Sequence, residues 1–119
     1  MSHYRAGRDK EYKVRDHLAD NGYEVIRAAG SKGKVDLVAF KAWLPSGPSS
    51  HHMLFVQVKR TGGTIPPADR VELIRLALIA RAVPLVAYQP VPRRPIQYRR
   101  LLGTGPKQWQ PWTPDEVAP

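Results

Sequence analysis

Hydrophobic and polar residues alternate most regularly in the middle of the chain, in the segment LFVQVKR. Leu54, Val56 and Val58 occupy every second position of it. Because successive side chains of a β-strand point to opposite faces, these three predict one buried face and place Gln57 and Lys59 together on the other. An amide beside an ammonium on such an apolar strand indicates either a solvated face or part of an active site.

The rest of the chain predicts two helices and four more strands. The predicted helices cover residues 8–21 and 68–81, and the predicted strands cover residues 23–29, 35–43, 54–60, 83–89 and 96–102. Gly22 is the expected C-terminal cap of the first helix, and Gly, Pro and Ser predict a turn over 30–34 and a loop over 44–52. The order α-β-β-β-α-β-β predicts an α/β fold, with a single domain in which helices flank a central mixed β-sheet.

The second predicted helix is unusually apolar. Eight of the ten residues from Val71 to Ala80 are apolar, and only Glu72 and Arg75 interrupt them. A helix that is apolar nearly all round is expected to be buried on more than one side. Its surplus apolar surface is therefore a candidate contact in a homodimer.

The end of the chain differs from the rest in composition. Residues 1–103 are expected to form the domain, and residues 104–119, which are rich in Pro and Trp, an irregular C-terminal tail. Trp109 and Trp112 could stack on nucleic acid bases. Packing on the body of the domain or at a dimer contact is the interpretation we favour for them.

Charge points to a polyanionic partner. The 119 residues include 19 Lys and Arg against 10 Asp and Glu, a formal net charge of +9, and nucleic acid is the first candidate. A basic protein without such a partner is the alternative. The absence of cysteine excludes disulfides and thiolate zinc sites. With no apolar run of about 20 residues and no signal pattern, we expect a cytoplasmic protein without a membrane partner.

Four polar residues fall where burial is expected. Glu11 lies on the apolar face of the first helix, Asp36 opens the second strand, and Gln57 and Lys59 share a face of the third. If the second and third strands pair, these side chains meet. Oxygen ligands beside a lysine suit Mg²⁺, which can polarise a phosphodiester and activate water, while lysine stabilises charge on the phosphate. In the alternatives, Asp36 is a turn residue and Glu11 forms a structural ion pair with Lys59 or Arg15.

A pair of adjacent histidines offers a second place to look for a metal. His51 and His52 lie in the predicted polar loop. No further ligand stands at a fixed spacing from them, so we expect a loop without a metal.

The segments RAGRDKEYKVRDHLADNGYEVIRAAGSKGKVDLVAF and LFVQVKR together resemble the archaeal-type Holliday junction resolvases, of the PD-(D/E)xK nuclease superfamily. The resemblance runs from about Arg5 to Tyr88. It implies a restriction-endonuclease-like domain and a Mg²⁺-dependent endodeoxyribonuclease, with Mn²⁺ as a substitute cofactor. The implied substrate is branched DNA, a four-way junction resolved by a homodimer through paired symmetric nicks, in DNA recombination and repair.

The resemblance also implies roles for individual residues. Glu11 is the helix carboxylate, Asp36 the principal metal ligand, Gln57 the occupant of the second acidic, metal-binding position, and Lys59 the catalytic lysine. Ser31 matches a serine near the scissile phosphate, although a serine beside glycine also fits ordinary turn chemistry. The residues expected on the DNA backbone are Arg5, Arg8, Arg27, Lys32, Lys34 and Arg60.

One position departs from the family pattern. Gln57 stands where these resolvases usually have glutamate, although Mrr-like endonucleases are similar in having Q-x-K. We expect an active enzyme in which Gln57 is a neutral ligand, and in which Gln57→Glu shifts the Mg²⁺ requirement to lower concentration. The alternatives are an endonuclease for another DNA substrate and a non-catalytic DNA-binding domain with a decayed nuclease site.

Overall fold

A computed structural model of the protein describes residues 3–28, 34–42, 51–60 and 62–114. Within these residues the helices are α1 (His3–Asp20) and α2 (Pro67–Ala80). The strands are β1 (Glu24–Arg27), β2 (Leu37–Ala42), β3 (His51–Val58), β4 (Val83–Tyr88), β5 (Gln97–Leu101) and β6 (Trp109–Trp112). Neither helix is long and apolar enough, over the described ranges, to cross a bilayer.

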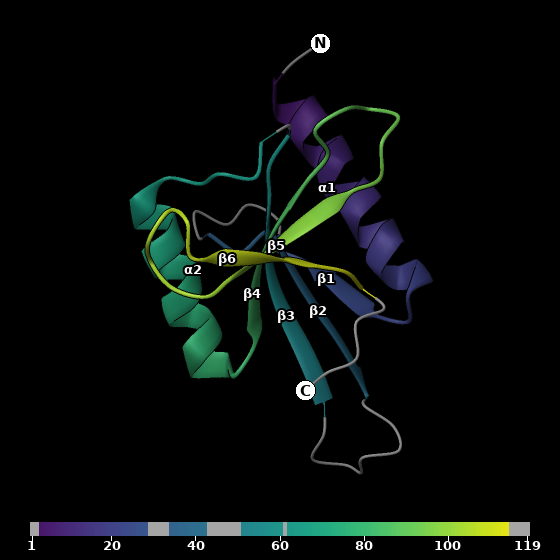
Figure 1. The fold of residues 1–119 in the computed structure, drawn as a ribbon. Coiled ribbons are helices and arrows are strands. Elements are labelled where there is room, and N and C mark those ends of the chain that lie inside the picture. The colour runs from purple at the N-terminus through teal and green to yellow at the C-terminus, as the bar shows by residue number, and fades with distance from the viewer. Residues whose placement is uncertain (1–2, 29–33, 43–50, 61, 115–119) are drawn as a thin grey trace.

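The six strands form one mixed sheet in the order β1-β2-β3-β4-β5-β6. Four of the five neighbouring pairs are antiparallel, and only β3 and β4 are parallel. Helix α2 makes the crossover between those two, as a parallel connection requires. Figure 1 shows α1 and α2 on opposite sides of the sheet, so the predicted single α/β domain with a mixed, helix-flanked sheet is confirmed.

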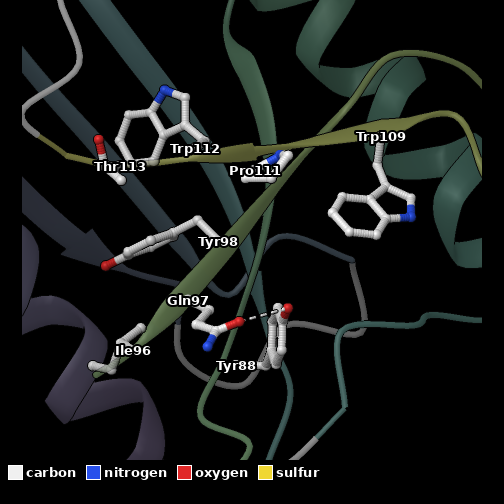
Figure 2. A pocket seen from close by; sticks show the side chains of 8 residues that line it. All are labelled: Tyr88, Ile96, Gln97, Tyr98, Trp109, Pro111, Trp112 and Thr113. Carbon is white, nitrogen blue, oxygen red and sulfur yellow. Dashed lines mark hydrogen bonds between the residues drawn. The ribbon is translucent and has the colours of Figure 1, made fainter. Parts of the chain in front are cut away.

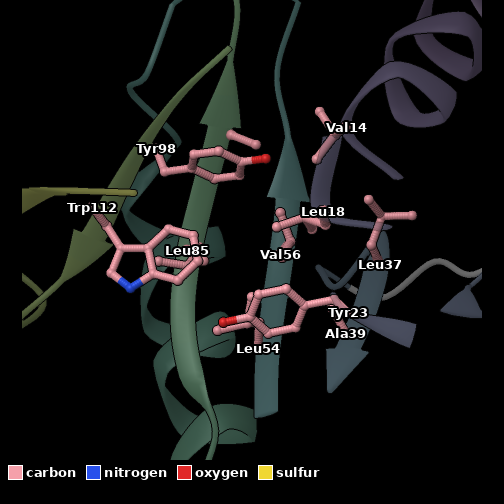
Figure 3. Packing of buried hydrophobic residues seen from close by; sticks show 11 residues of the cluster. Val14, Leu18, Tyr23, Leu37, Ala39, Leu54, Val56, Leu85, Tyr98 and Trp112 are labelled. Carbon is pink, nitrogen blue, oxygen red and sulfur yellow. The ribbon is translucent and has the colours of Figure 1, made fainter. Parts of the chain in front are cut away.

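The larger core cluster lies between α1 and the sheet (Figure 3). Val14 and Leu18 of α1 are fully buried against Leu54 and Val56 of β3. The smaller cluster, on the α2 side, contains Ile65, Leu73, Val86 and Leu101, with Phe55 packed against it. The predicted division of β3 into two faces is therefore confirmed.

A glycine ends α1 in the way its sequence predicts. Gly22 has a φ of 90°, and its N–H donates to Ala19 O at 3.0 Å, while Tyr23 N donates to Leu18 O at 3.1 Å. This pair of bonds is the Schellman motif, which satisfies the last carbonyls of a helix. Tyr23 and Leu18 are both buried in the larger core, so the cap also fixes how the chain enters β1.

The predicted irregular tail is wrong for residues 109–112. They form β6, which pairs antiparallel with β5 at the edge of the sheet. An edge position tolerates Pro111, because a proline there need not donate to a neighbour. Trp112 is 3% exposed and packs edge-to-face on Tyr98, with ring centroids 5.2 Å apart. The favoured interpretation, packing on the domain, is thus confirmed for Trp112.

Two further expectations need correction. The predicted loop over 44–52 is too long, since β3 begins at His51 and His52 is a buried residue paired with Lys41. Within one chain α2 buries a single stripe, whereas Leu78 and Ile79 are 73% and 70% exposed. The sheet offers α2 one face to cover, so the expectation of burial on several sides fails in the isolated chain.

Candidate active site

Asp36 lies just before β2 and is held by hydrogen bonds on both sides. Its N–H donates to Val56 O at 2.8 Å, its carbonyl accepts from Ala28 N at 2.9 Å, and its carboxylate Oδ2 accepts from Val58 N at 2.7 Å. Burial raises the pKa of Asp36, which the Val58 N–H opposes and the charge of Glu11 reinforces. Asp36 is thus a clamped carboxylate at the end of β3, and the hydrogen bond that it accepts from β3 argues against a simple turn residue.

Gln57 and Lys59 extend the site along β3 and the residues after it. Gln57 is 7% exposed, and its side-chain oxygen Oε1 is buried without a hydrogen-bond partner. A buried acceptor left unpaired costs about 1–3 kcal/mol, so this oxygen is suited to a cation or a donor. Lys59 follows the last residue of β3, and its N–H donates to Ala87 O of β4 at 2.8 Å. The backbone of the lysine is therefore anchored to the parallel neighbour.

Glu11 reaches the same region from α1 and is paired with Arg27 of β1. The Arg27 Nε and Glu11 Oε1 atoms are 2.8 Å apart, and the two side chains are 23% and 21% exposed. The charges of Glu11, Arg27 and Lys59 all influence the Asp36 carboxyl, which places the four groups together. The described ion-pair partner of Glu11 is thus Arg27, and not Lys59 or Arg15, which the alternative interpretation named as partners; Arg15 pairs with Asp16 at 2.9 Å.

One acidic residue at the site, Asp69, is not among the site residues that the sequence predicted. Asp69 lies in the first turn of α2, where its carboxylate is 3.1 Å from Lys34 Nζ and accepts a hydrogen bond from the Gln57 side chain. Burial alone would raise the pKa of Asp69, but these hydrogen bonds and the charges of Lys34 and Lys59 lower it. An acidic residue in a first helical turn is common, so its sequence signal concerned the helix rather than the site.

The predicted DNA-binding residues are brought together only in part. Arg8 is partly exposed and Arg60 exposed, while Lys34 is held by Asp69. Ser31 and Lys32 lie outside the described residues, as does the side chain of Arg5. Lys10 of α1 is a further basic residue, and it was not among the predicted DNA-binding residues.

Lys10 adds a cation to the same part of the surface. Its Nζ donates to Gln89 Oε1 at 2.6 Å, at the end of β4. Burial, followed by the charges of Lys13 and Arg60, lowers the pKa of Lys10. The charges of two other cations, one on α1 and one just after β3, therefore act on Lys10, and a phosphate backbone would neutralise such a group of cations.

The oxygen atoms of the site fit a hard divalent cation. Glu11 and Asp36 offer carboxylates, and Gln57 offers the unpaired amide oxygen. Mg²⁺ is bound by oxygen ligands of these kinds. No group of three or more His, Asp or Glu side chains arranged to hold a metal occurs in the described ranges, so a metal here would depend on the Gln57 amide.

A cavity elsewhere in the molecule is distinct from this site. It measures about 240 Å³ and is lined largely by aromatic residues of β4, β5 and β6, among them Tyr88, Tyr98, Trp109 and Trp112 (Figure 2). None of the predicted site residues lines it. The chemistry of the site therefore belongs to the end of β3 and not to this cavity.

The six-stranded mixed sheet with a helix on each face is the restriction-endonuclease-like fold that the sequence predicts. The fold is similar to that of the Holliday junction resolvase Hjc of Archaeoglobus fulgidus, with a TM-score of 0.58 and 23% identity over 77% of this chain and 70% of that one. The model of the archaeal Holliday junction resolvase (Hjc) family matches residues 2–96, and the chain belongs to that family. No curated protein matches the chain.

Proposed function

We propose that the protein is a Mg²⁺-dependent, structure-selective DNA endonuclease that resolves four-way junctions by paired symmetric nicks. The observation that carries the proposal is the clamped Asp36 carboxylate beside the unpaired oxygen of Gln57 and the anchored Lys59. Membership of the resolvase family supports the same assignment.

Each residue of the site has a part that its surroundings favour. Glu11, Asp36 and Gln57 would hold the cation, which when bound polarises the phosphodiester and makes a water molecule a better nucleophile. Val58 N–H fixes the Asp36 carboxylate, and Arg27 fixes that of Glu11, so neither must reorganise when DNA binds. Lys59 carries the charge that can stabilise the developing negative charge on the phosphate.

The proposed enzyme works as a homodimer, because a four-way junction presents two symmetry-related strands to cut. The exposed Leu78 and Ile79 of α2 support a contact there. An adjacent groove of about 340 Å³ runs beside Leu78 between α2 and the strands β4 and β5. Ile79→Glu should shift sedimentation toward the monomer, whereas Val91→Glu, at a 49% exposed valine outside α2, should not. A parent protein that sediments as a stable monomer at micromolar concentration would refute the dimer.

Cleavage of three substrates tests the activity. With Mg²⁺, the protein should cut a four-way junction in preference to a linear duplex or a flap. Asp36→Asn and Lys59→Ala should keep the fold and the junction affinity but lose about 10²–10⁴-fold in cleavage rate. The matched controls are Asp20→Asn and Lys107→Ala, at exposed positions away from the site, which should cut at the parental rate.

The outcomes separate the alternatives. Preferential cutting of the duplex or the flap would assign a different nuclease specificity. Tight junction binding without cleavage at any Mg²⁺ concentration would identify a DNA-binding domain whose nuclease site has decayed. If either Asp36→Asn or Lys59→Ala cuts normally, the role given to that residue is wrong.

A further inference from the structure

The most informative unexplained feature of the site is the orientation of the Gln57 amide. The amide has an oxygen and an NH₂ at its end, and a hydrogen-bond network decides which of them points where. Here the side chain donates to Asp69, so the NH₂ is used and the oxygen is the group left unpaired in a 7% exposed environment. A carboxylate only accepts, so Asp69 enforces this orientation and excludes the reverse one.

Asp69 itself is held in place by groups on two other segments. It sits in the first turn of α2, and the N-terminal cap residue Pro66 makes no side-chain hydrogen bond to the helix. Lys34, which precedes Asp36 by two residues, pairs with the Asp69 carboxylate at 3.1 Å. The Asp69 side chain is only 15% exposed. It therefore connects α2 to β3, through Gln57, and to the segment that precedes β2, through Lys34.

We propose that Asp69 is a positioning residue of the active site, which fixes the Gln57 amide with its oxygen free to serve as a ligand. This inference rests on the proposed function for the identity of the ligand, a divalent cation. Its geometric content, a donor–acceptor contact between residues 57 and 69, is independent of catalysis.

The contact predicts coupling between two substitutions in the metal-free protein. Gln57→Glu places two carboxylates against each other and should lower the urea midpoint of unfolding. Adding Asp69→Asn to Gln57→Glu gives residue 69 the donor and residue 57 the acceptor, the reverse of the parent, at the same net charge. The urea midpoint of this double variant should return most of the way to the parental value. Double-mutant cycles report such contacts as non-additive effects. Additive midpoints would overturn the contact.

Mg²⁺ affinity, measured by isothermal titration calorimetry without DNA, tests whether the contact positions a ligand. Asp69→Asn should weaken Mg²⁺ binding by about tenfold, as for other residues that orient metal ligands. Glu72→Gln removes a negative charge from the same helix, where Glu72 pairs with Arg75 on the surface, and should leave the affinity unchanged.

A second cycle separates positioning from simple attraction by charge. In a Gln57→Leu background there is no amide to orient, so Asp69→Asn should cause no further loss of Mg²⁺ affinity. An equal loss in both backgrounds would show that Asp69 acts by its charge alone and would overturn the positioning role. A further outcome is a parent protein that binds Mg²⁺ and shows coupling between residues 57 and 69 and yet cuts no DNA. That result would support this inference while refuting the proposed nuclease.

Discussion

A methyl group at residue 63 tests how tightly the segment after β3 is packed against the far end of the sheet. Gly63 is buried, and a Cβ there would lie 2.6 Å from Arg99 Nε and 2.7 Å from Tyr88 Cε1. Both neighbours are held in place. The Arg99 guanidinium lies 3.9 Å from the centroid of the Trp109 ring, and the Tyr88 hydroxyl donates to Gln97 at 3.0 Å (Figure 2).

The expected cost follows from these distances. Carbon atoms in contact are about 3.5–4.0 Å apart, so Arg99 or Tyr88 must move by roughly 1 Å. Such overpacking costs about 1–3 kcal/mol, which includes any loss of the cation–π contact between Arg99 and Trp109. Alanine also restricts the unfolded chain more than glycine does, which offsets about 0.4–1 kcal/mol of this cost. We therefore expect Gly63→Ala to lower the free energy of unfolding by about 1–2 kcal/mol and the melting temperature by roughly 3–10 °C.

The preceding glycine is a matched control. A Cβ at Gly62 would meet no atom within 4 Å, and neither glycine has a positive φ. Gly62→Ala should therefore be neutral or stabilising by up to about 1 kcal/mol. Urea unfolding followed by tryptophan fluorescence, without metal or DNA, measures both, and Arg99→Ala should relieve part of the cost of Gly63→Ala. Equal stability of the two alanine variants would refute the packing.

Three further predictions concern the helix ends, an internal histidine and the DNA contact. Gly22→Ala should cost about 1 kcal/mol of stability, because Gly22 has a φ of 90°. Arg81→Gly should stabilise the protein by roughly 0.5–1 kcal/mol, because Arg81 has a φ of 54°. Thermal unfolding of both variants checks these two predictions. Burial, with the charges of Lys41 and Arg100, lowers the pKa of His52, so the folded state binds fewer protons than the unfolded state. The free energy of unfolding should therefore fall as the pH drops below about 6.5, and it should fall less steeply in His52→Phe. Urea midpoints measured at a series of pH values would give parallel curves for the two proteins if this is wrong. Junction affinity should fall linearly with salt on a log–log plot, and a flat dependence measured by fluorescence anisotropy would exclude binding dominated by phosphate contacts.

The sequence predicted those parts of the fold whose signal is local. Alternation in β3 predicted opposite faces for Leu54 and Phe55, which lie in different core clusters, and Gly22 marked the end of α1. Strand β6 was missed because WQPW is short and Pro111 argues against a strand. Its pairing with β5 is decided by a tertiary neighbour, and no local pattern contains that information.

The residues of the site likewise divide into those that local sequence signals could predict and those that they could not. Asp36 and Gln57 could be proposed as neighbours because a hairpin of adjacent strands brings them together. Asp69 could not, since it is separated from Gln57 by a loop and lies on a helix whose direction only the tertiary structure fixes. The ion pair between Glu11 and Arg27 was likewise invisible, because no spacing rule relates a helix to the strand that follows it.

The topology explains why these residues meet at one end of β3. Antiparallel pairing of β2 with β3 brings the start of β2, and with it Asp36, to the end of β3 where Lys59 lies. Because β4 runs parallel to β3, the crossover helix α2 must begin at that same end, which brings Asp69 of its first turn to Gln57. The single parallel pair of the sheet is thus what allows α2 to contribute to the site. A variant with extra residues inserted between β3 and α2 should keep the sheet but lose the coupling between residues 57 and 69; persistence of that coupling would contradict this account.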